Sequence, residues 1–159
     1  MSTSNQADAT TNEASGEATS TAGNELNQTV WLLRSKINPF PVASALTLRD
    51  GVLSLVLQPG ASDAFLGWVA ERMERNLDEL KAELVAGQTV PVFNTRDFTI
   101  TWPKTFAGAA MEITVDGRSW LACLSYPSGS ALWQTMNLIT GRRQSKAWKA
   151  ALAQLAGAA

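Results

Sequence analysis

The chain has 159 residues, of which 45% are hydrophobic and 17% are charged, and its formal net charge is −1. This composition predicts one domain with a real hydrophobic core, and the small net charge argues against a general polyanion binder. The chain has no histidine and one cysteine, Cys123, which removes the commonest general base and transition-metal ligand, any intramolecular disulfide and any cysteine-based zinc site. We therefore expect no enzymatic activity, no metal and no cofactor.

The first 25 residues contain no lysine or arginine. Residues 1–24 hold no aromatic or large aliphatic side chain after Met1, so they cannot bury enough apolar area to offset about 1–2 kcal/mol of backbone entropy per residue. The acidic residues of the segment are Asp8, Glu13, Glu17 and Glu25. We predict a disordered acidic tail over 1–25 and a single domain over 26–159. A phosphorylatable or partner-docking arm is the alternative role for the tail.

The start of the chain is polar and shows no secretory signal, and no stretch approaches 18 consecutive apolar residues. Together with the lone cysteine, these features favour a cytoplasmic protein with no membrane span.

The first strands follow the tail. The segment QTVWLLRSKI (28–37) is rich in β-formers and predicts a strand, which NPFP (38–41) ends because proline cannot donate to a ladder. In ALTLRDGVLSLVL (45–57), Asp50 and Gly51 form a pair typical of a two-residue type I′ turn. The resulting hairpin register pairs Arg49 with Val52, Leu48 with Leu53 and Leu46 with Leu55, and places the leucines on one face.

The segment 62–86 changes to a helical period. Ser62 or Asp63 is a suitable N-cap and Gly87 a suitable stop, so we predict one amphipathic helix of about six turns with a solvated charged face. Its apolar stripe consists of Phe65, Val69, Met73, Leu77, Leu80 and Leu84.

Strand chemistry returns after this helix. Residues 89–103 predict two short strands linked at 94–97. Residues 110–127 predict a second hairpin that turns at Asp116 and Gly117. Its register pairs Val115 with Arg118, Ile113 with Trp120 and Met111 with Ala122.

The end of the chain is helical in pattern. We predict a helix over 128–141 that is capped by Ser130 and interrupted at Gly141, and a resumed helix from about residue 144 to residue 156. The elements amount to about seven antiparallel strands closed by a C-terminal helix.

This order resembles the pleckstrin-homology-like (PH/GRAM-like) superfold. The segments LTLRDGVLSLVL, PVFNTRDFTITWPK, MEITVDGRSWLACLSYP and GRRQSKAWKAAL resemble a group of small actinobacterial proteins with PH-like sheets, over residues 29–155. The resemblance implies an α+β fold: a PH-like antiparallel barrel or sandwich of about seven strands, with a long inserted helix at about 62–86 and a C-terminal capping helix. These motifs concern the sheet and helix packing, so they imply a fold and no chemistry.

Two departures limit what the resemblance implies. The helix at 62–86 lies between the third and fourth strands, where a simple PH domain has a loop. PH domains that bind phosphoinositides use basic residues between their first two strands, and here that loop has only Lys36 at its edge. Phosphoinositide binding is therefore not implied.

The basic C-terminal segment is the candidate functional region. On a helix, Trp148, Leu152 and Leu155 form one stripe, which we interpret as a structural cap over the open end of the sheet. The cations form a separate face that consists of Arg142, Arg143, Lys146 and Lys149. An ordinary solvated face is the simplest interpretation of these cations, followed by contact with an acidic partner protein and then with an anionic membrane. Nucleic acid is not expected, because the tryptophan is not interleaved with the cations.

Other candidate sites have structural explanations. Cys123 is flanked by Ala122 and Leu124 in a strand and has no histidine to activate it, so we expect a buried thiol. The segment YPSGS (126–130) lacks the G-x-S-x-G pattern of a nucleophile elbow. Of the six tryptophans, an exposed one, Trp31 or Trp133, would indicate an interface.

The sequence thus favours a non-catalytic intracellular protein-interaction or adaptor module, which either binds an unknown protein partner or self-associates. The alternatives are a peripheral module that binds anionic membranes weakly through the C-terminal cations, and a carrier of a small apolar ligand.

Overall fold

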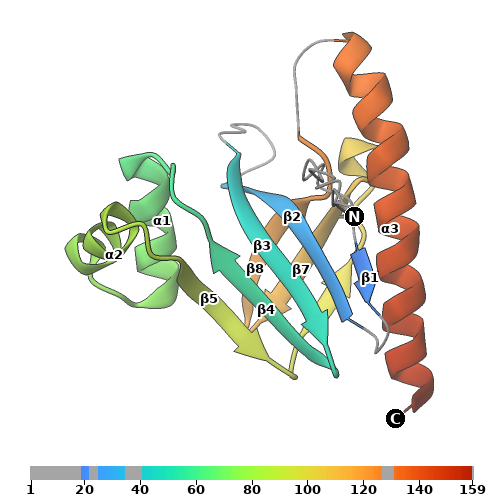
Figure 1. Ribbon diagram of the computed structural model, residues 1–159, viewed down its shortest axis with the longest axis horizontal. Coiled ribbons are helices and arrows are strands. Elements are labelled where there is room, and N and C mark those ends of the chain that lie inside the picture. The colour runs from blue at the N-terminus through green and yellow to red at the C-terminus, as the bar shows by residue number, and fades with distance from the viewer. Residues whose placement is uncertain (1–18, 22–24, 35–40, 127–130, 159) are drawn as a thin grey trace, which may run out of the picture.

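An antiparallel sheet and three α-helices make up the computed structural model, which describes residues 19–21, 25–34, 41–126 and 131–158 (Figure 1). The strands are β1 (Thr19–Thr21), β2 (Glu25–Leu33), β3 (Val42–Arg49), β4 (Val52–Leu57), β5 (Val90–Thr95), β6 (Thr99–Thr101), β7 (Ala110–Val115) and β8 (Arg118–Cys123). The helices are α1 (Asp63–Met73), α2 (Leu77–Val85), α3 (Ala131–Ala158) and the short 3-10 helix η1 (Thr105–Gly108).

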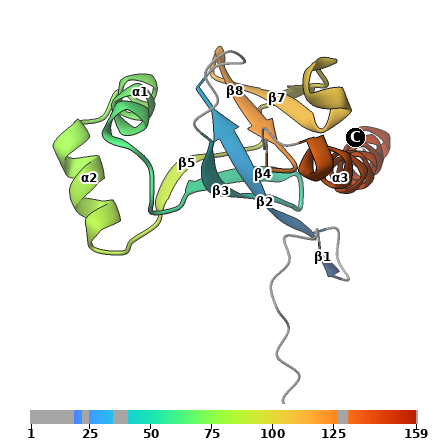
Figure 2. The same cartoon turned by 90° about the horizontal axis from the view of Figure 1, so that it is seen from above.

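The sheet consists of two meanders joined through β2. Its strand order is β5-β4-β3-β2-β8-β7-β6, and β1 pairs with β2 off this path. The two meanders face each other across one core, since Phe93 of β5 and Trp120 of β8 lie 6.4 Å apart by ring centroids although their strands are not neighbours (Figure 2). The prediction of an α+β fold with an antiparallel sheet and a C-terminal helix is confirmed.

The expected closure into a barrel or sandwich is only partly met, because the sheet stays open. β5 and β6 are the two ends of the strand order and do not pair, although residues 96–98 alone separate them in the chain. At this corner Arg96 donates to the Asp50 carbonyl oxygen at 2.8 Å, which ties the corner to the β3–β4 turn. After this corner the chain enters β6, which pairs with β7 and not with β5.

Both hairpins are confirmed in turn and in register. Leu48 pairs with Leu53 across β3 and β4, and Ile113 pairs with Trp120 across β7 and β8. The four turn residues adopt positive φ, as a type I′ turn requires; they are Asp50 (50°), Gly51 (77°), Asp116 (51°) and Gly117 (74°).

Two segments of the predicted disordered tail lie in strands. Thr19–Thr21 forms β1, and Glu25 begins β2. The composition of this region gives no reason to expect a strand. β1 is ordered by pairing with β2, which satisfies its backbone hydrogen-bonding groups. The rest of the predicted tail lies outside the described residues, as does the predicted cap Ser130.

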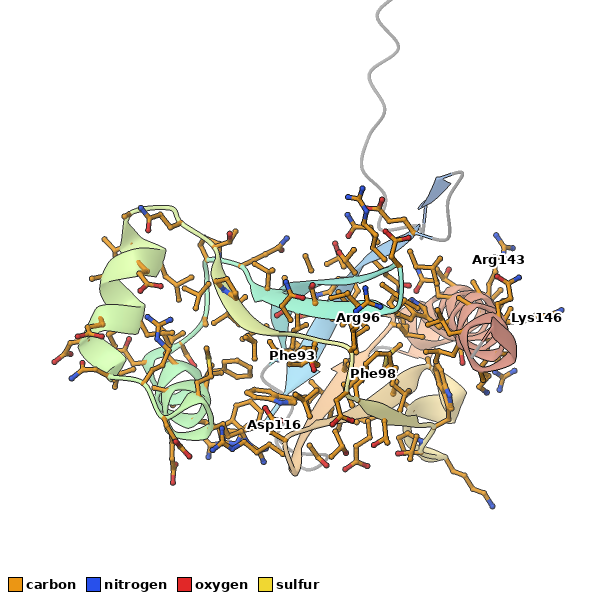
Figure 3. The ribbon with its side chains drawn as sticks, turned by 90° about the horizontal axis from the view of Figure 1, so that it is seen from below. Phe93, Arg96, Phe98, Asp116, Arg143 and Lys146 are labelled. Carbon is orange, nitrogen blue, oxygen red and sulfur yellow. The ribbon has the colours of Figure 1, made fainter. Side chains whose placement is uncertain are left out.

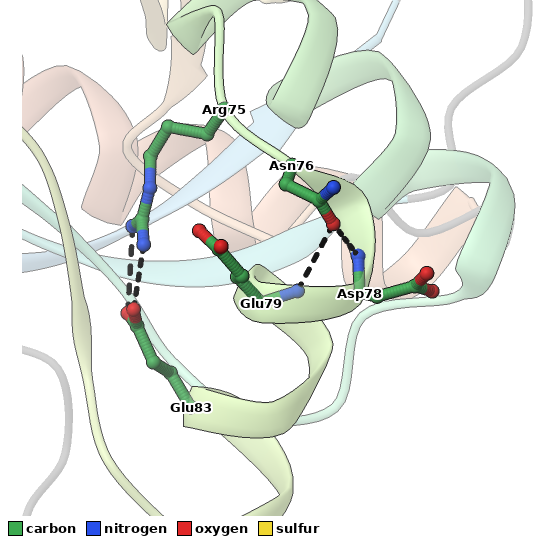
Figure 4. Close-up of polar contacts among 5 residues, drawn as sticks. All are labelled: Arg75, Asn76, Asp78, Glu79 and Glu83. Atoms are coloured by element: carbon green, nitrogen blue, oxygen red, sulfur yellow. Dashed lines mark hydrogen bonds and ion pairs between the residues drawn. The ribbon is translucent and has the colours of Figure 1, made fainter.

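The predicted single helix at 62–86 is wrong, because the chain forms two helices there. Glu74 ends α1 in the left-handed conformation, with φ 54° and ψ 39°. Asn76 then caps α2: its side-chain oxygen accepts hydrogen bonds from the backbone N–H of Asp78 at 2.8 Å and of Glu79 at 3.3 Å (Figure 4). A side-chain cap satisfies N–H groups that have no partner within the helix, and so a new helix starts. The predicted N-cap Ser62 does cap α1, since its hydroxyl accepts from the Phe65 N–H.

Replacing Asn76 with alanine should lower the free energy of unfolding by about 1 kcal/mol, because two N–H groups of α2 lose their acceptor. Asn76→Ser should stay within a few tenths of a kcal/mol of the wild type, since serine is also a good cap. Equilibrium urea unfolding measures both. Equal stability of the alanine and serine variants would contradict the assigned cap.

The predicted interruption of the last helix at Gly141 is also wrong, since α3 is continuous from Ala131 to Ala158. Gly141 is buried beside Ala109, which precedes β7, and Ser125, which follows β8. A Cβ atom at this position would lie 2.5 Å from the Ala109 Cβ and 3.0 Å from the Ser125 Oγ. The glycine therefore permits a close helix–sheet approach and does not mark a break.

The helices close the two sides of the core. α1 and α2 lie at one end of the sheet and α3 lies at the other, as the two views show (Figures 1 and 2). Phe65, Val69 and Leu80 of the first two helices and Trp148 of α3 belong to one buried cluster with the inward-facing leucines of β3 and β4. Within the described residues, no helix has the length and apolar content to cross a membrane.

Candidate functional site

Trp148 anchors α3 in the core. Its side chain is 0% exposed, and its Nε1 donates a hydrogen bond to the Gln28 Oε1 at 2.7 Å. The Gln28 Nε2 in turn donates to the Leu124 carbonyl oxygen at 3.2 Å. The indole N–H and both polar atoms of the Gln28 amide thus have hydrogen-bond partners, as is usual for buried polar groups.

The anchor lies where β2 changes neighbours. One side of β2 pairs with β1 at residues 25–27 and with β8 at residues 31–33. Gln28 lies between these two pairings, and its position in the inward alternation of β2 directs it towards α3. The indole therefore fills the point at which the sheet divides. Leu152 and Leu155 are half-buried and continue the contact along α3.

The four cations of α3 are exposed but do not share one environment. The Lys149 Nζ lies 4.8 Å from the centroid of the half-buried Trp102 ring, so this ammonium packs on the sheet side of the helix. Arg142 also makes a contact. Arg143 and Lys146 point away from the sheet into solvent (Figure 3), and neither forms an ion pair within the described residues. Arg143 and Lys146 are below called the outer basic face of α3.

Electrostatics at α3 are one-sided. The helix carries four basic residues and no acidic residue, so its formal charge is +4. Ile139, one turn before Arg143, is 60% exposed and lies on the same side of the helix by its spacing. The outer basic face therefore combines two cations with one exposed aliphatic side chain.

An arginine between two indoles joins α1 to the second hairpin. The Arg72 guanidinium carbon lies 4.7 Å from the Trp68 ring centroid and 5.5 Å from the Trp120 centroid, and its Nη1 donates to the Ser119 carbonyl oxygen at 2.7 Å. Glu74 and Arg118 form an ion pair beside it. Local sequence pattern does not indicate this contact, because it joins residues 47 positions apart.

A smaller apolar cluster lies on the outer face of the sheet. Trp31 and Tyr126 meet edge to face, with ring centroids 5.8 Å apart and planes at 84°. Tyr126 is 50% exposed and Trp31 is half-buried. The side chain of Trp133, the other tryptophan considered as an interface residue, lies outside the described residues.

Cys123 lies in this cluster and is 1% exposed. Burial raises the pKa of its thiol to about 12. The thiol is therefore protonated at neutral pH, and thiolate, the reactive form of cysteine, is scarce. In the unfolded chain the thiol has a pKa of about 8.5. The stability that depends on the buried, protonated thiol is therefore fully present at neutral pH, and it is lost as the pH rises from about 8.5 towards 12.

Iodoacetamide should alkylate Cys123 at least about a hundredfold more slowly than it alkylates a cysteine placed at Val85, because little thiolate forms at the buried site. Val85 is 88% exposed and makes a matched control in the same chain. Mass spectrometry of timed samples at about pH 8 gives both rates. Similar rates at the two positions would contradict the burial of Cys123.

No family model matches the chain, and no curated protein or solved structure is detectably similar to it. Among the described residues, no three histidine, cysteine, aspartate or glutamate side chains are grouped so that they could hold a metal ion.

Proposed function

We propose that this chain is a non-catalytic, intracellular protein-interaction module of PH-like fold, which binds an acidic partner protein through the outer basic face of α3. One observation carries the proposal: Arg143 and Lys146 project into solvent on a helix of charge +4, while Trp148 on the opposite side closes the core. The seven-strand antiparallel path followed by a C-terminal helix supports the PH-like part of the proposal.

A protein partner fits this surface better than a nucleic acid does. A surface for nucleic acid combines a broad basic track with free aromatic faces for stacking. Here the aromatic ring next to the cations, Trp102, is half-buried beneath Lys149, and the chain as a whole carries a charge of −1. Two outward cations on a rigid helix instead suit a local acidic patch, with most of their effect on the association rate and on specificity.

Affinity capture with the immobilised chain, in extract of the native host, tests the proposal. Partners should be retained by the wild type, released as the salt concentration rises, and lost with the Arg143→Glu/Lys146→Glu variant, because like charges then face each other. The matched control is Arg34→Glu/Lys104→Glu, which changes the net charge equally at two exposed positions outside α3.

Retention that is equal for the wild type and the α3 variant would contradict the proposal. Equal loss from both variants would also contradict it, because the net charge of the chain and not the outer basic face would then decide binding.

A second candidate, peripheral binding to an anionic membrane, is favoured by the exposed Ile139 beside the cations. Each cation near an anionic surface contributes about 1 kcal/mol, and an inserted aliphatic side chain adds to this. Co-sedimentation with phosphatidylserine-containing vesicles at low and high salt tests it. Membrane binding is supported if the wild type pellets with the vesicles at low salt and the Ile139→Asp variant does not. A wild type that does not pellet at low salt would rule out membrane binding.

A further inference from the structure

The two ends of the molecule carry opposite charge. α3 has a formal charge of +4, whereas residues 61–89, which contain α1 and α2, hold six acidic and three basic residues and so carry −3. These elements lie at opposite ends of the sheet (Figures 1 and 2). A single copy therefore cannot bring its own acidic end onto its own basic end.

Part of the acidic charge is already neutralised. The three paired carboxylates are Asp63 with Lys81, Glu74 with Arg118 and Glu83 with Arg75. Glu71, Asp78 and Glu79, on either side of the α1–α2 junction, are exposed and form no ion pair within the described residues. Because Glu79 also attracts the Arg75 guanidinium, Glu71 and Asp78 are the carboxylates of the acidic end most available to a partner.

The exposed faces of α2 and α3 also match in pattern. On α2, Asp78 lies seven residues before Val85, which is 88% exposed; on α3, Ile139, which is 60% exposed, lies seven residues before Lys146. Positions seven apart share a helix face and are about 10 Å apart along the axis. Antiparallel alignment of the two helices therefore places Asp78 opposite Lys146 and Val85 opposite Ile139.

We propose that the acidic partner is a second copy of this chain, whose α2 packs antiparallel against α3 of the first copy through these two contacts. The inference rests on the proposed function, since it uses the same outer basic face. The two surfaces differ and lie at opposite ends, so the contact is heterologous; repeated from copy to copy, it builds a ring where the rotation closes and an open head-to-tail chain where it does not. The charge contact is screened by salt over about 8 Å at physiological ionic strength, so the assembly weakens as salt rises.

Two charge-reversed variants test the proposal in sedimentation equilibrium of the full chain. The α3 variant is Arg143→Glu/Lys146→Glu, and the α2 variant is Asp78→Lys/Glu79→Lys. We expect the mass of the wild type at low salt to rise with concentration above the monomer value, and to return to the monomer value at high salt. Each variant alone should associate at least about tenfold more weakly, and an equimolar mixture should regain association, because opposite charges then meet again.

Two controls keep the result independent of folding and of net charge. Val85→Asp changes a position that is 88% exposed and lies outside the first turn of α2, and it should weaken association as the α2 variant does. Arg34→Glu/Lys104→Glu should associate as the wild type does. Circular dichroism verifies that each variant is folded.

A wild type that stays monomeric at low salt would overturn the proposal, as would a mixture that associates no better than its components. A monomeric wild type that still captures another acidic protein through Arg143 and Lys146 would overturn self-association and leave the proposed function standing.

Discussion

Replacing Trp148 with alanine lowers the free energy of unfolding by about 3–5 kcal/mol. The side chain is 0% exposed, so its loss removes the apolar contacts of an indole and leaves a cavity where the sheet divides. It also leaves the Gln28 Oε1 without its donor at 2.7 Å, and an unpartnered buried acceptor costs about 1–3 kcal/mol. Since domains are commonly stable by only about 5–15 kcal/mol, this variant should be near the limit of folding.

Urea unfolding followed by far-ultraviolet circular dichroism measures the effect. Trp148→Phe separates the two contributions, because it keeps most of the apolar contact but no indole N–H; we expect it to lose about 1–3 kcal/mol. Lys146→Ala, on the opposite side of the same helix, should stay within about 0.5 kcal/mol of the wild type. A Trp148→Ala variant as stable as Lys146→Ala would show that α3 does not close the core.

Replacing Gly141 with alanine lowers the free energy of unfolding by about 1–3 kcal/mol, although alanine is the better helix former. The added Cβ would lie 2.5 Å from the Ala109 Cβ, so α3 must move away from the sheet. Gly67 in α1 is the matched control, because a Cβ there meets nothing within 4 Å. Gly67→Ala should stabilise the chain by about 0.5–1 kcal/mol.

The opposite signs of the two substitutions are the diagnostic result, measured by thermal and urea unfolding. Stabilisation by Gly141→Ala as well as by Gly67→Ala would mean that α3 does not approach Ala109 and Ser125 as closely as the structure shows.

The hairpins could be predicted in full because two independent signals agree. The Asp50–Gly51 and Asp116–Gly117 turns set where each chain reverses, and the apolar alternation sets which residues face inward. Either signal alone would leave the register open by a residue, which would turn every side chain to the other face.

The break between α1 and α2 was missed although a local signal exists. The apolar stripe through Met73 and Leu77 keeps a helical spacing across the break, which favours one long helix. Asn76 followed three residues later by Glu79 is, however, the pattern of a capping residue with an acidic first turn. Periodicity concealed a helix start that the cap residues indicate.

Other features depend on partners distant in sequence, so local pattern could not reveal them. Whether Gly141 breaks α3 or lets it approach the sheet depends on Ala109 and Ser125, and openness of the sheet depends on which strand edges meet. The Trp148–Gln28 contact could be predicted in part. The alternation of β2 places the polar Gln28 at an inward position, which indicates a buried hydrogen-bond partner but does not identify it as Trp148.

α3 divides into a buried side, which holds the fold through Trp148, and an outer basic face, which does not. Urea unfolding of the Arg143→Glu/Lys146→Glu variant tests this division most directly. We expect a free energy of unfolding within about 1 kcal/mol of the wild type, because both side chains are exposed and form no ion pair within the described residues. A loss of about 3 kcal/mol or more, comparable with that of Trp148→Ala, would show that these cations hold the fold and would contradict the account.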